Sequence, residues 1–220
     1  MSSVESHIVI AIDGPAASGK SSVSQILAKQ LGFAHIDTGA MYRAMTWRLL
    51  GLPVDTTNAE AIVAALETID TDYSIEDGHL RQRLDGLDPT AFLKDDDVSA
   101  SVSNVASVPE VRALLVASQQ ALLDVDNLVM EGRDIGSNVF PDSPHKFYID
   151  ADPEVRAQRR RAEGSADAIR ERDKIDSTRK TAPLKVADNA VVIDSTKLTL
   201  DAVVAKVADI LRDRGLAIHS

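Results

Sequence analysis

Short runs of consecutive apolar residues alternate along the chain with longer stretches in which apolar residues recur at helical spacing. Unpatterned runs of this length are typical of strands that are buried on both faces, as in a parallel sheet. The candidate strands are residues 8–12, 33–37, 128–130, 147–149 and 191–193. Because parallel strands need helical crossovers between them, the pattern predicts an α/β fold with helices on both sides of the sheet.

Four helices are predicted between and after these runs. The first has Val23, Ile26, Leu27 and Leu31 on one face and ends at Gly32, a residue that commonly terminates helices. A second is expected over residues 41–50. Pro153 follows Asp152 in the order that favours a helix start, and Thr199 can cap the final, strongly amphipathic helix.

Residues 73–87 do not follow this alternation of apolar runs and helical stretches. Apolar and polar residues alternate on both sides of Glu76-Asp77-Gly78, which is typical of a β-hairpin with a tight turn. We therefore expect a hairpin inserted into the α/β body. The charged run from Lys94 to Asp97 is interpreted as a solvated loop or a helix start.

Composition narrows the class of protein. Of the 220 residues 44% are hydrophobic and 26% are charged, and the net charge is −10. This charge argues against binding to polymeric nucleic acid, which needs an excess of Lys and Arg. The absence of cysteine excludes disulfides and thiolate metal sites. No basic leader or apolar run of about 20 residues is seen, so a cytoplasmic protein without a membrane partner is expected.

A phosphate-binding loop follows the first predicted strand. Its residues fit the pattern G-x-x-x-x-G-K-[ST] and are Gly14, Pro15, Ala16, Ala17, Ser18, Gly19, Lys20 and Ser21. Backbone N–H groups and the helix N-terminus would hold the phosphates of a nucleoside triphosphate, Lys20 would reach the β and γ phosphates, and Ser21 would bind Mg²⁺. A chance glycine turn is the alternative, but the strand before it and the helix after it argue against one.

The loop alone is compatible with a kinase, an ATPase or a GTPase. The N-K-x-D pattern that reads guanine in GTPases is absent, and there is no long ATPase body. Arginines are concentrated in residues 156–179, and an arginine fork suits bidentate contact to phosphate. These features favour a kinase that phosphorylates a small acceptor.

Two further motifs combine an arginine with a carboxylate. Residues 37–43 follow the second predicted strand, and residues 131–136 follow the third. Because ligands of a parallel sheet bind at the carboxyl ends of its strands, both motifs are expected beside the phosphate loop. Either motif alone could also be ordinary turn chemistry with exposed salt bridges.

Taken together, these segments resemble the bacterial cytidylate kinases. The similarity runs in order over nearly the whole chain, through IAIDGPAASGKSS, DTGAMYR, VPEVRALL, EGRDIGSNVFPDSPHKFYIDA, RERDKIDSTRKTAPL and VVIDST. It implies a single P-loop kinase domain with a five-stranded parallel sheet, an acceptor-binding insertion at about 56–104 and a short lid at about 159–179. The core would comprise about 1–55, 105–158 and 180–220.

The resemblance also implies roles for individual residues. ATP phosphates would be held by Gly14 through Ser22, with Mg²⁺ at Ser21. The catalytic cations would be Lys20, Arg133, Arg172 and Arg179. The acceptor site would contain Thr38, Tyr42, Arg43, Ser103, Arg112, Arg133, Asp134, Arg172, Asp176 and Arg179, of which Ser103, Arg112 and Asp176 would read the cytosine edge.

The sequence departs from the family pattern at two positions. Lys94 stands where an arginine is frequent, so a point charge replaces a fork. Glu131 stands where some members have Asp, which keeps a carboxylate for metal or water contact but lengthens its reach. Lid arginines are expected around 156–161. The five histidines show no metal-binding or base arrangement and receive no role.

The expected activity is transfer of a phosphoryl group from ATP to CMP or dCMP, within pyrimidine nucleotide metabolism, by a monomeric enzyme. A kinase for another small acceptor, such as UMP, AMP or a shikimate-like metabolite, remains an alternative. A nucleotide sensor without catalytic activity is a second alternative, although a sensor would need no second phosphate pocket.

Overall fold

The computed structural model describes residues 7–162 and 184–219. In this part of the chain one sheet has seven strands in the order β3-β4-β2-β5-β1-β6-β7. The strands are β1 (Val9–Asp13), β2 (Ala34–Asp37), β3 (Thr71–Glu76), β4 (His79–Leu84), β5 (Leu128–Gly132), β6 (His145–Asp150) and β7 (Val191–Asp194). Strands β2, β5, β1, β6 and β7 pair in parallel, which confirms the predicted α/β class.

The sheet is larger than the five strands predicted. The additional strands are β3 and β4, the two arms of the predicted hairpin, which pair antiparallel along their whole length. The hairpin turn uses Asp77 and Gly78, both with positive φ. Strand β4 then joins β2 through the pair His35 and His79. The hairpin therefore extends the edge of the main sheet, because β2 would otherwise leave its outer edge unpaired.

The helices and short helical turns complete the described part of the chain. They are α1 (Lys20–Leu31), α2 (Thr38–Leu50), α3 (Ala59–Leu66), η1 (Thr90–Phe92), α4 (Asp96–Val105), α5 (Pro109–Ala121), η2 (Leu122–Asp124), η3 (Ile135–Val139), α6 (Pro153–Ala162) and α8 (Leu200–Asp213). None of the helices in the described ranges is long and apolar enough to cross a membrane.

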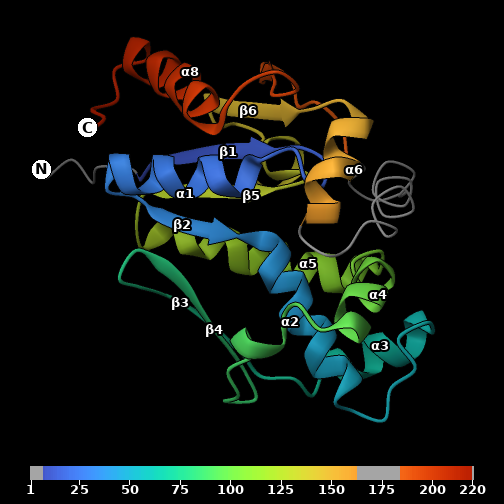
Figure 1. Ribbon diagram of the computed structural model, residues 1–220. Coiled ribbons are helices and arrows are strands. Elements are labelled where there is room, and N and C mark those ends of the chain that lie inside the picture. The colour runs from blue at the N-terminus through green and yellow to red at the C-terminus, as the bar shows by residue number, and fades with distance from the viewer. Residues whose placement is uncertain (1–6, 163–183, 220) are drawn as a thin grey trace, which may run out of the picture.

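Two hydrophobic cores lie on opposite faces of the sheet. Ile10 and Ile12 of β1 pack with α1 and α8, whereas Val9 and Ala11 pack with α2 and α5. This division follows from the alternation of side chains along a strand. It produces three layers, with α1 and α8 on one side of the sheet and α2 and α5 on the other (Figure 1).

Local signals mark the ends of three predicted helices, whereas α2 begins at Thr38 and not at residue 41, because the Asp37 side chain caps it. Gly32 ends α1 with φ of 68°, a conformation that costs glycine little. The Thr199 side chain accepts the N–H of Ala202 at 3.2 Å and caps α8. Pro153 opens α6, while Asp152 Oδ1 accepts the N–H of Glu154 at 2.8 Å.

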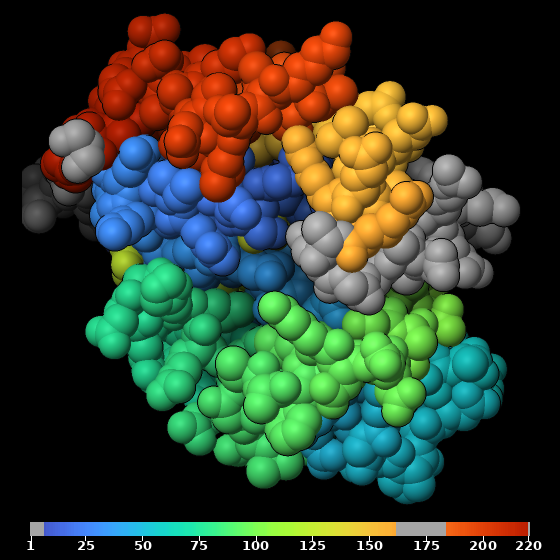
Figure 2. Space-filling model, in the orientation of Figure 1, coloured from blue at the N-terminus to red at the C-terminus, as the bar shows by residue number. Residues whose placement is uncertain are grey.

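The predicted insertion shares its core with the sheet. Ile62 of α3 and Leu84 of β4 are fully or almost fully buried in the same cluster as Ile36 and Met130. In Figure 2 the teal and green surface of these elements lies below the blue surface of α1. The boundaries of core, insertion and lid remain predictions.

The parallel strands point toward one edge of the molecule. In Figure 1, β1, β2 and β6 run in the same direction, and α4 and α6 lie beyond their carboxyl ends. The phosphate loop and both arginine motifs begin where β1, β2 and β5 end. The topology therefore brings all three motifs to the edge at which α/β proteins bind their ligands.

Candidate active site

The phosphate loop connects β1 to α1 and depends on two glycines. Gly14 has φ of 154°, and a Cβ there would lie 2.1 Å from the backbone oxygen of Ile149. Gly19 has φ of 92° and immediately precedes α1. Lys20 is buried, and its Nζ donates to the Pro15 oxygen at 3.2 Å. The lysine is therefore held across the loop, at the N-terminal end of a helix that favours anions.

Two arginines of α6 bind the carbonyl groups of this loop. Arg156 Nη1 donates to the Ala16 oxygen at 3.3 Å, and Arg159 Nη1 donates to the Ser18 oxygen at 3.3 Å. Arg159 Nη2 also donates to the Ser195 oxygen at 2.9 Å. In a trans peptide the C=O and the N–H of the following residue point in opposite directions. Because the Ala16 and Ser18 oxygens face α6, the N–H groups of the residues that follow them point away from α6. Both arginines belong to the range predicted to supply lid residues.

A carboxylate at the end of β5 is linked to the phosphate loop. The Ser21 hydroxyl donates to Glu131 Oε2 at 2.6 Å, and His35 Nε2 lies 3.2 Å from Glu131 Oε1. Burial works to raise the pKa of Glu131, but the hydrogen bond with His35, the charge of Lys20 and the Ser21 hydroxyl together hold that pKa below its usual range. Glu131 is therefore an ionised carboxylate beside the predicted magnesium ligand.

Asp37 provides a second carboxylate at this edge. It is the register partner of Glu131 on the neighbouring strand, and its side chain accepts the N–H of Ala40 at 3.2 Å at the start of α2. Burial, followed by the nearby charge of Glu131, raises the pKa of Asp37. Two carboxylates with opposite pKa shifts beside one lysine form an environment typical of a functional site.

The second motif places its predicted residues on α2. Thr38 Oγ1 donates to the backbone oxygen of Glu131 at 2.8 Å. Gly132 permits this approach, since a Cβ there would lie 2.6 Å from Thr38 Oγ1. Arg43 Nη1 donates to the Leu93 oxygen and to the Ser99 hydroxyl, both at 2.9 Å. Arg43 therefore joins the main body to the beginning of α4.

Two other guanidinium groups, from different elements, act electrostatically on Arg43. Burial lowers the pKa of Arg43, and the positive charges of Arg160 and Arg133 lower it further, whereas Asp37 opposes them. Arg43 lies on α2, Arg133 follows β5 and Arg160 lies on α6. Like charges gathered in this way are stabilised when an anion lies between them. Arg43 and Arg133 were predicted to bind the acceptor, and Arg160 belongs to the predicted lid range.

A buried ion pair joins two of the predicted acceptor residues. Arg112 Nη2 donates to Asp134 Oδ2 at 2.5 Å, and both side chains are less than a tenth exposed. The guanidinium carbon of Arg112 lies 5.5 Å from the ring centroid of Tyr42, within cation–π range. Arg112 Nε is buried and has no hydrogen-bond partner among the described residues. Arg112, Asp134 and Tyr42 thus form one connected group.

Four further residues were predicted for the acceptor site. Ser103 lies half-buried on α4. Arg172, Asp176 and Arg179 lie outside the described residues. Their predicted contacts to the base and to the transferring phosphoryl group therefore stay predictions.

Asp13 is a buried carboxylate beside the candidate site that sequence analysis missed. It is 2% exposed at the end of β1, and its two oxygens accept the N–H groups of Ile135 and Gly136, both at 2.8 Å. The carboxylate thereby ties the segment after Arg133 and Asp134 to the strand that leads into the phosphate loop. Its partners are more than 120 positions away in the chain, so no local pattern could have identified this role.

The buried Asp13 is expected to make stability depend on pH. Burial raises its pKa from 3.8 to about 6, outweighing the two backbone hydrogen bonds. The folded protein therefore holds a proton here that the unfolded chain releases, so this contribution to stability is present below pH 4 and is lost as pH rises through 6. Asn cannot titrate, so the variant lacks this loss of stability. The free energy of unfolding of Asp13→Asn minus that of wild type should therefore rise by up to about 3 kcal/mol between pH 4 and 7. Urea unfolding of both proteins across this range checks the shift, and parallel pH curves would contradict it.

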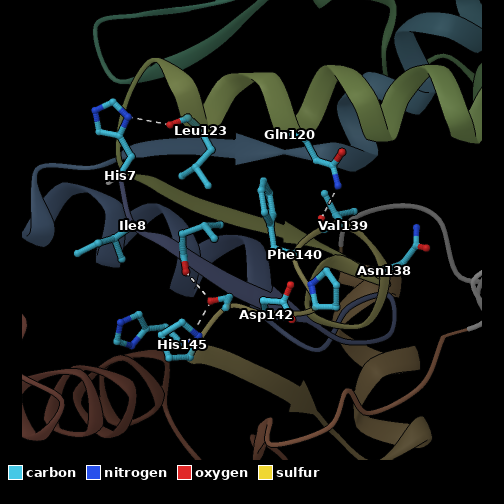
Figure 3. A pocket seen from close by; sticks show the side chains of 13 residues that line it. His7, Ile8, Gln120, Leu123, Asn138, Val139, Phe140, Asp142 and His145 are labelled. Atoms are coloured by element: carbon cyan, nitrogen blue, oxygen red, sulfur yellow. Dashed lines mark hydrogen bonds between the residues drawn. The ribbon is translucent and has the colours of Figure 1, made fainter. Parts of the chain in front are cut away.

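A hollow at the opposite edge of the sheet is separate from these residues. Its volume is about 630 Å³, and it is lined by residues 7–9, 120, 123 and 138–145. Figure 3 shows the side chains of His7 and Gln120 turned toward backbone oxygens. His7 Nδ1 lies 2.7 Å from the Leu123 oxygen, and Gln120 Nε2 donates to the Val139 oxygen at 2.8 Å. The hollow lies at the amino ends of β1 and β6, away from the phosphate loop.

Known proteins similar in sequence identify the family of this chain. A family model described as cytidylate kinase matches residues 10–213. The chain is 42% identical to the cytidylate kinase of Caldicellulosiruptor saccharolyticus, covering 92% of this chain and 95% of the relative. It is 42% identical to the cytidylate kinase of Geobacillus thermodenitrificans, covering 96% and 99% of the two chains.

A longer relative carries two activities in its name. The chain is 43% identical to a bifunctional pantoate ligase/cytidylate kinase of Synechococcus, over 94% of this chain but only 45% of that protein's length. The family model matches nearly the whole chain, and two cytidylate kinases are 42% identical to it over almost their full length. This chain belongs to the cytidylate kinase family.

Proposed function

We propose that this protein transfers the terminal phosphoryl group of ATP to CMP and dCMP, forming CDP and dCDP. The observation that carries the proposal is the phosphate loop, in which Nζ of the buried Lys20 donates to the Pro15 oxygen, at the same sheet edge as Arg43, whose pKa the charges of Arg160 and Arg133 lower. A second anionic substrate between these arginines would neutralise their mutual repulsion. Membership of the cytidylate kinase family supports a nucleoside monophosphate as that substrate.

Phosphoryl transfer requires positioning and charge stabilisation more than covalent chemistry by the protein. Its transition state spreads negative charge over the moving group, with the attacking and leaving oxygens in line. Lys20 and Arg133 are proposed to stabilise that charge, together with Arg172 and Arg179. The backbone of residues 14–22 is proposed to hold the phosphates of ATP.

The residues around Ser21 fit a magnesium ion. Mg²⁺ prefers hard oxygen donors, keeps several waters and binds proteins through one or two groups together with substrate phosphates. Ser21 and Glu131 offer such oxygens in direct contact with each other. No cluster of His, Cys, Asp or Glu in the described ranges could hold a metal alone, in keeping with a cation shared with ATP. When bound, Mg²⁺ would neutralise phosphate charge.

Cytosine recognition is proposed to involve Ser103, Arg112 and Asp176. Cytosine presents an amino donor at N4 and acceptors at O2 and N3, which suit a carboxylate or hydroxyl and a guanidinium, respectively. The buried Nε of Arg112, which has no hydrogen-bond partner in ranges 7–162 and 184–219, supports this assignment, because a bound acceptor would satisfy it. Uracil places an acceptor at position 4, opposite the proposed Asp176 carboxylate.

Phosphorylation of CMP, dCMP, UMP and AMP, measured side by side as ADP release, tests the proposal. We expect kcat/KM for CMP to exceed that for UMP and AMP by on the order of 10²-fold or more, because a mismatched base leaves buried polar groups unpaired. Asp176→Ala should reduce the preference of CMP over UMP. Faster turnover of UMP or AMP would instead indicate a different acceptor, and no ADP release with any mononucleotide would indicate a nucleotide sensor.

A further inference from the structure

His35 begins a chain of contacts that ends at the proposed magnesium ligand. Its Nε2 lies 3.2 Å from Glu131 Oε1, and the other oxygen of that carboxylate accepts the Ser21 hydroxyl at 2.6 Å. His35 is 8% exposed and Glu131 is 1% exposed. The two residues lie on neighbouring parallel strands, β2 and β5. Buried residues on adjacent strands hold their side chains in a narrow range of directions, so the contacts are fixed relative to the phosphate loop.

The direction of each hydrogen bond follows from the chemistry of the groups. The oxygens of a glutamate carboxylate accept hydrogen bonds, so His35 donates from Nε2 to Glu131. Ser21 likewise donates its single hydroxyl proton to Glu131. Both lone pairs of the Ser21 oxygen are then left for other partners. A hydroxyl oxygen in this state is well suited to ligate a cation.

We propose that His35 is a positioning residue for magnesium: it holds the Glu131 carboxylate so that Glu131 accepts the hydrogen bond of the Ser21 hydroxyl and leaves the Ser21 oxygen facing Mg²⁺. The inference rests on the proposed ATP-dependent function and adds a residue to its metal site. His35 itself contacts neither the cation nor the phosphates.

Loss of the His35 donor has a specific expected consequence. Glu131 Oε1 would be buried without that hydrogen bond, and the carboxylate could rotate away from Ser21 toward another donor. Removing the partner that orients a group near a metal typically weakens metal affinity by about 10- to 100-fold. The phosphate loop itself would be unchanged, so ATP binding without metal should be retained.

Three substitutions separate the hydrogen bond from the volume of the side chain. In His35→Gln the amide nitrogen can occupy the place of Nε2. In His35→Asn the amide nitrogen reaches only as far as Nδ1, and in His35→Leu no donor remains. Calorimetric titration of each protein with ATP, in excess MgCl₂ and in EDTA, measures how much Mg²⁺ strengthens ATP binding.

We expect this strengthening to fall about tenfold in His35→Leu and His35→Asn and to stay near wild type in His35→Gln. ATP affinity in EDTA should be the same in all four proteins. His79→Leu is the matched control, since His79 is exposed and pairs with His35 in register on β4. Its magnesium effect should equal that of wild type.

Two results would overturn the proposal. One is an unchanged magnesium effect in His35→Asn, and the other is an equal loss in His35→Asn and His35→Gln. If His35→Leu does not fold, the comparison of Asn with Gln still decides. The titrations contain no CMP, so a failure to phosphorylate CMP would contradict the proposed function without affecting this test.

Discussion

Lys20→Ala is expected to lower kcat for CMP phosphorylation by about 10²- to 10³-fold, the usual cost of removing one group that stabilises transition-state charge. Lys20 lies at the N-terminal end of α1 and is anchored to the Pro15 oxygen. Its ammonium group is therefore preorganised beside the phosphate loop. The initial rate of CDP formation at saturating ATP and CMP measures the effect.

Lys29→Ala is the matched control for this prediction. Lys29 lies on the same helix and is exposed, so the substitution removes one charge from α1 far from the loop. It should leave kcat unchanged. Thermal unfolding of both variants shows whether the fold is intact. Turnover by folded Lys20→Ala at the rate of Lys29→Ala would contradict a catalytic role for Lys20.

Breaking the Arg112–Asp134 pair is expected to produce the largest loss of stability. Both side chains are less than a tenth exposed, and removing one partner of a buried pair leaves an uncompensated charge. Arg112→Met and Asp134→Leu should each lower the free energy of unfolding by about 3–5 kcal/mol. The double variant should recover most of that loss, because two apolar side chains need no partner. Urea unfolding measures all four proteins.

The same variants separate stability from substrate binding. If both residues also bind the acceptor, KM for CMP should rise in the double variant although its stability returns. An exposed ion pair serves as the control: Arg81 and Glu76 are about half exposed, so Arg81→Met should cost less than about 1 kcal/mol. If Arg112→Met and Asp134→Leu lose no more stability than Arg81→Met, the Arg112–Asp134 pair is solvated. A double variant with normal KM for CMP would limit the pair to a structural role.

The sequence by itself determined the features that depend on neighbouring residues. Buried apolar runs specified the parallel strands, and Gly32 and Thr199 marked helix ends, because strand burial and helix capping are decided within a few positions. The phosphate loop could also be recognised from the sequence, since Gly14, Gly19 and Lys20 lie close together along the chain. The family resemblance extended these local signals to an activity.

The tertiary structure alone decided the contacts between distant segments. It placed the Asp13 carboxylate on Ile135 and Gly136, and it joined the hairpin to the edge of β2. It also brought His35, which sequence analysis gave no role, to Glu131, 96 positions away. Strand order and register create these contacts, and neither is encoded in the local alternation of apolar and polar residues. A buried polar residue shows its function only when its partner is known.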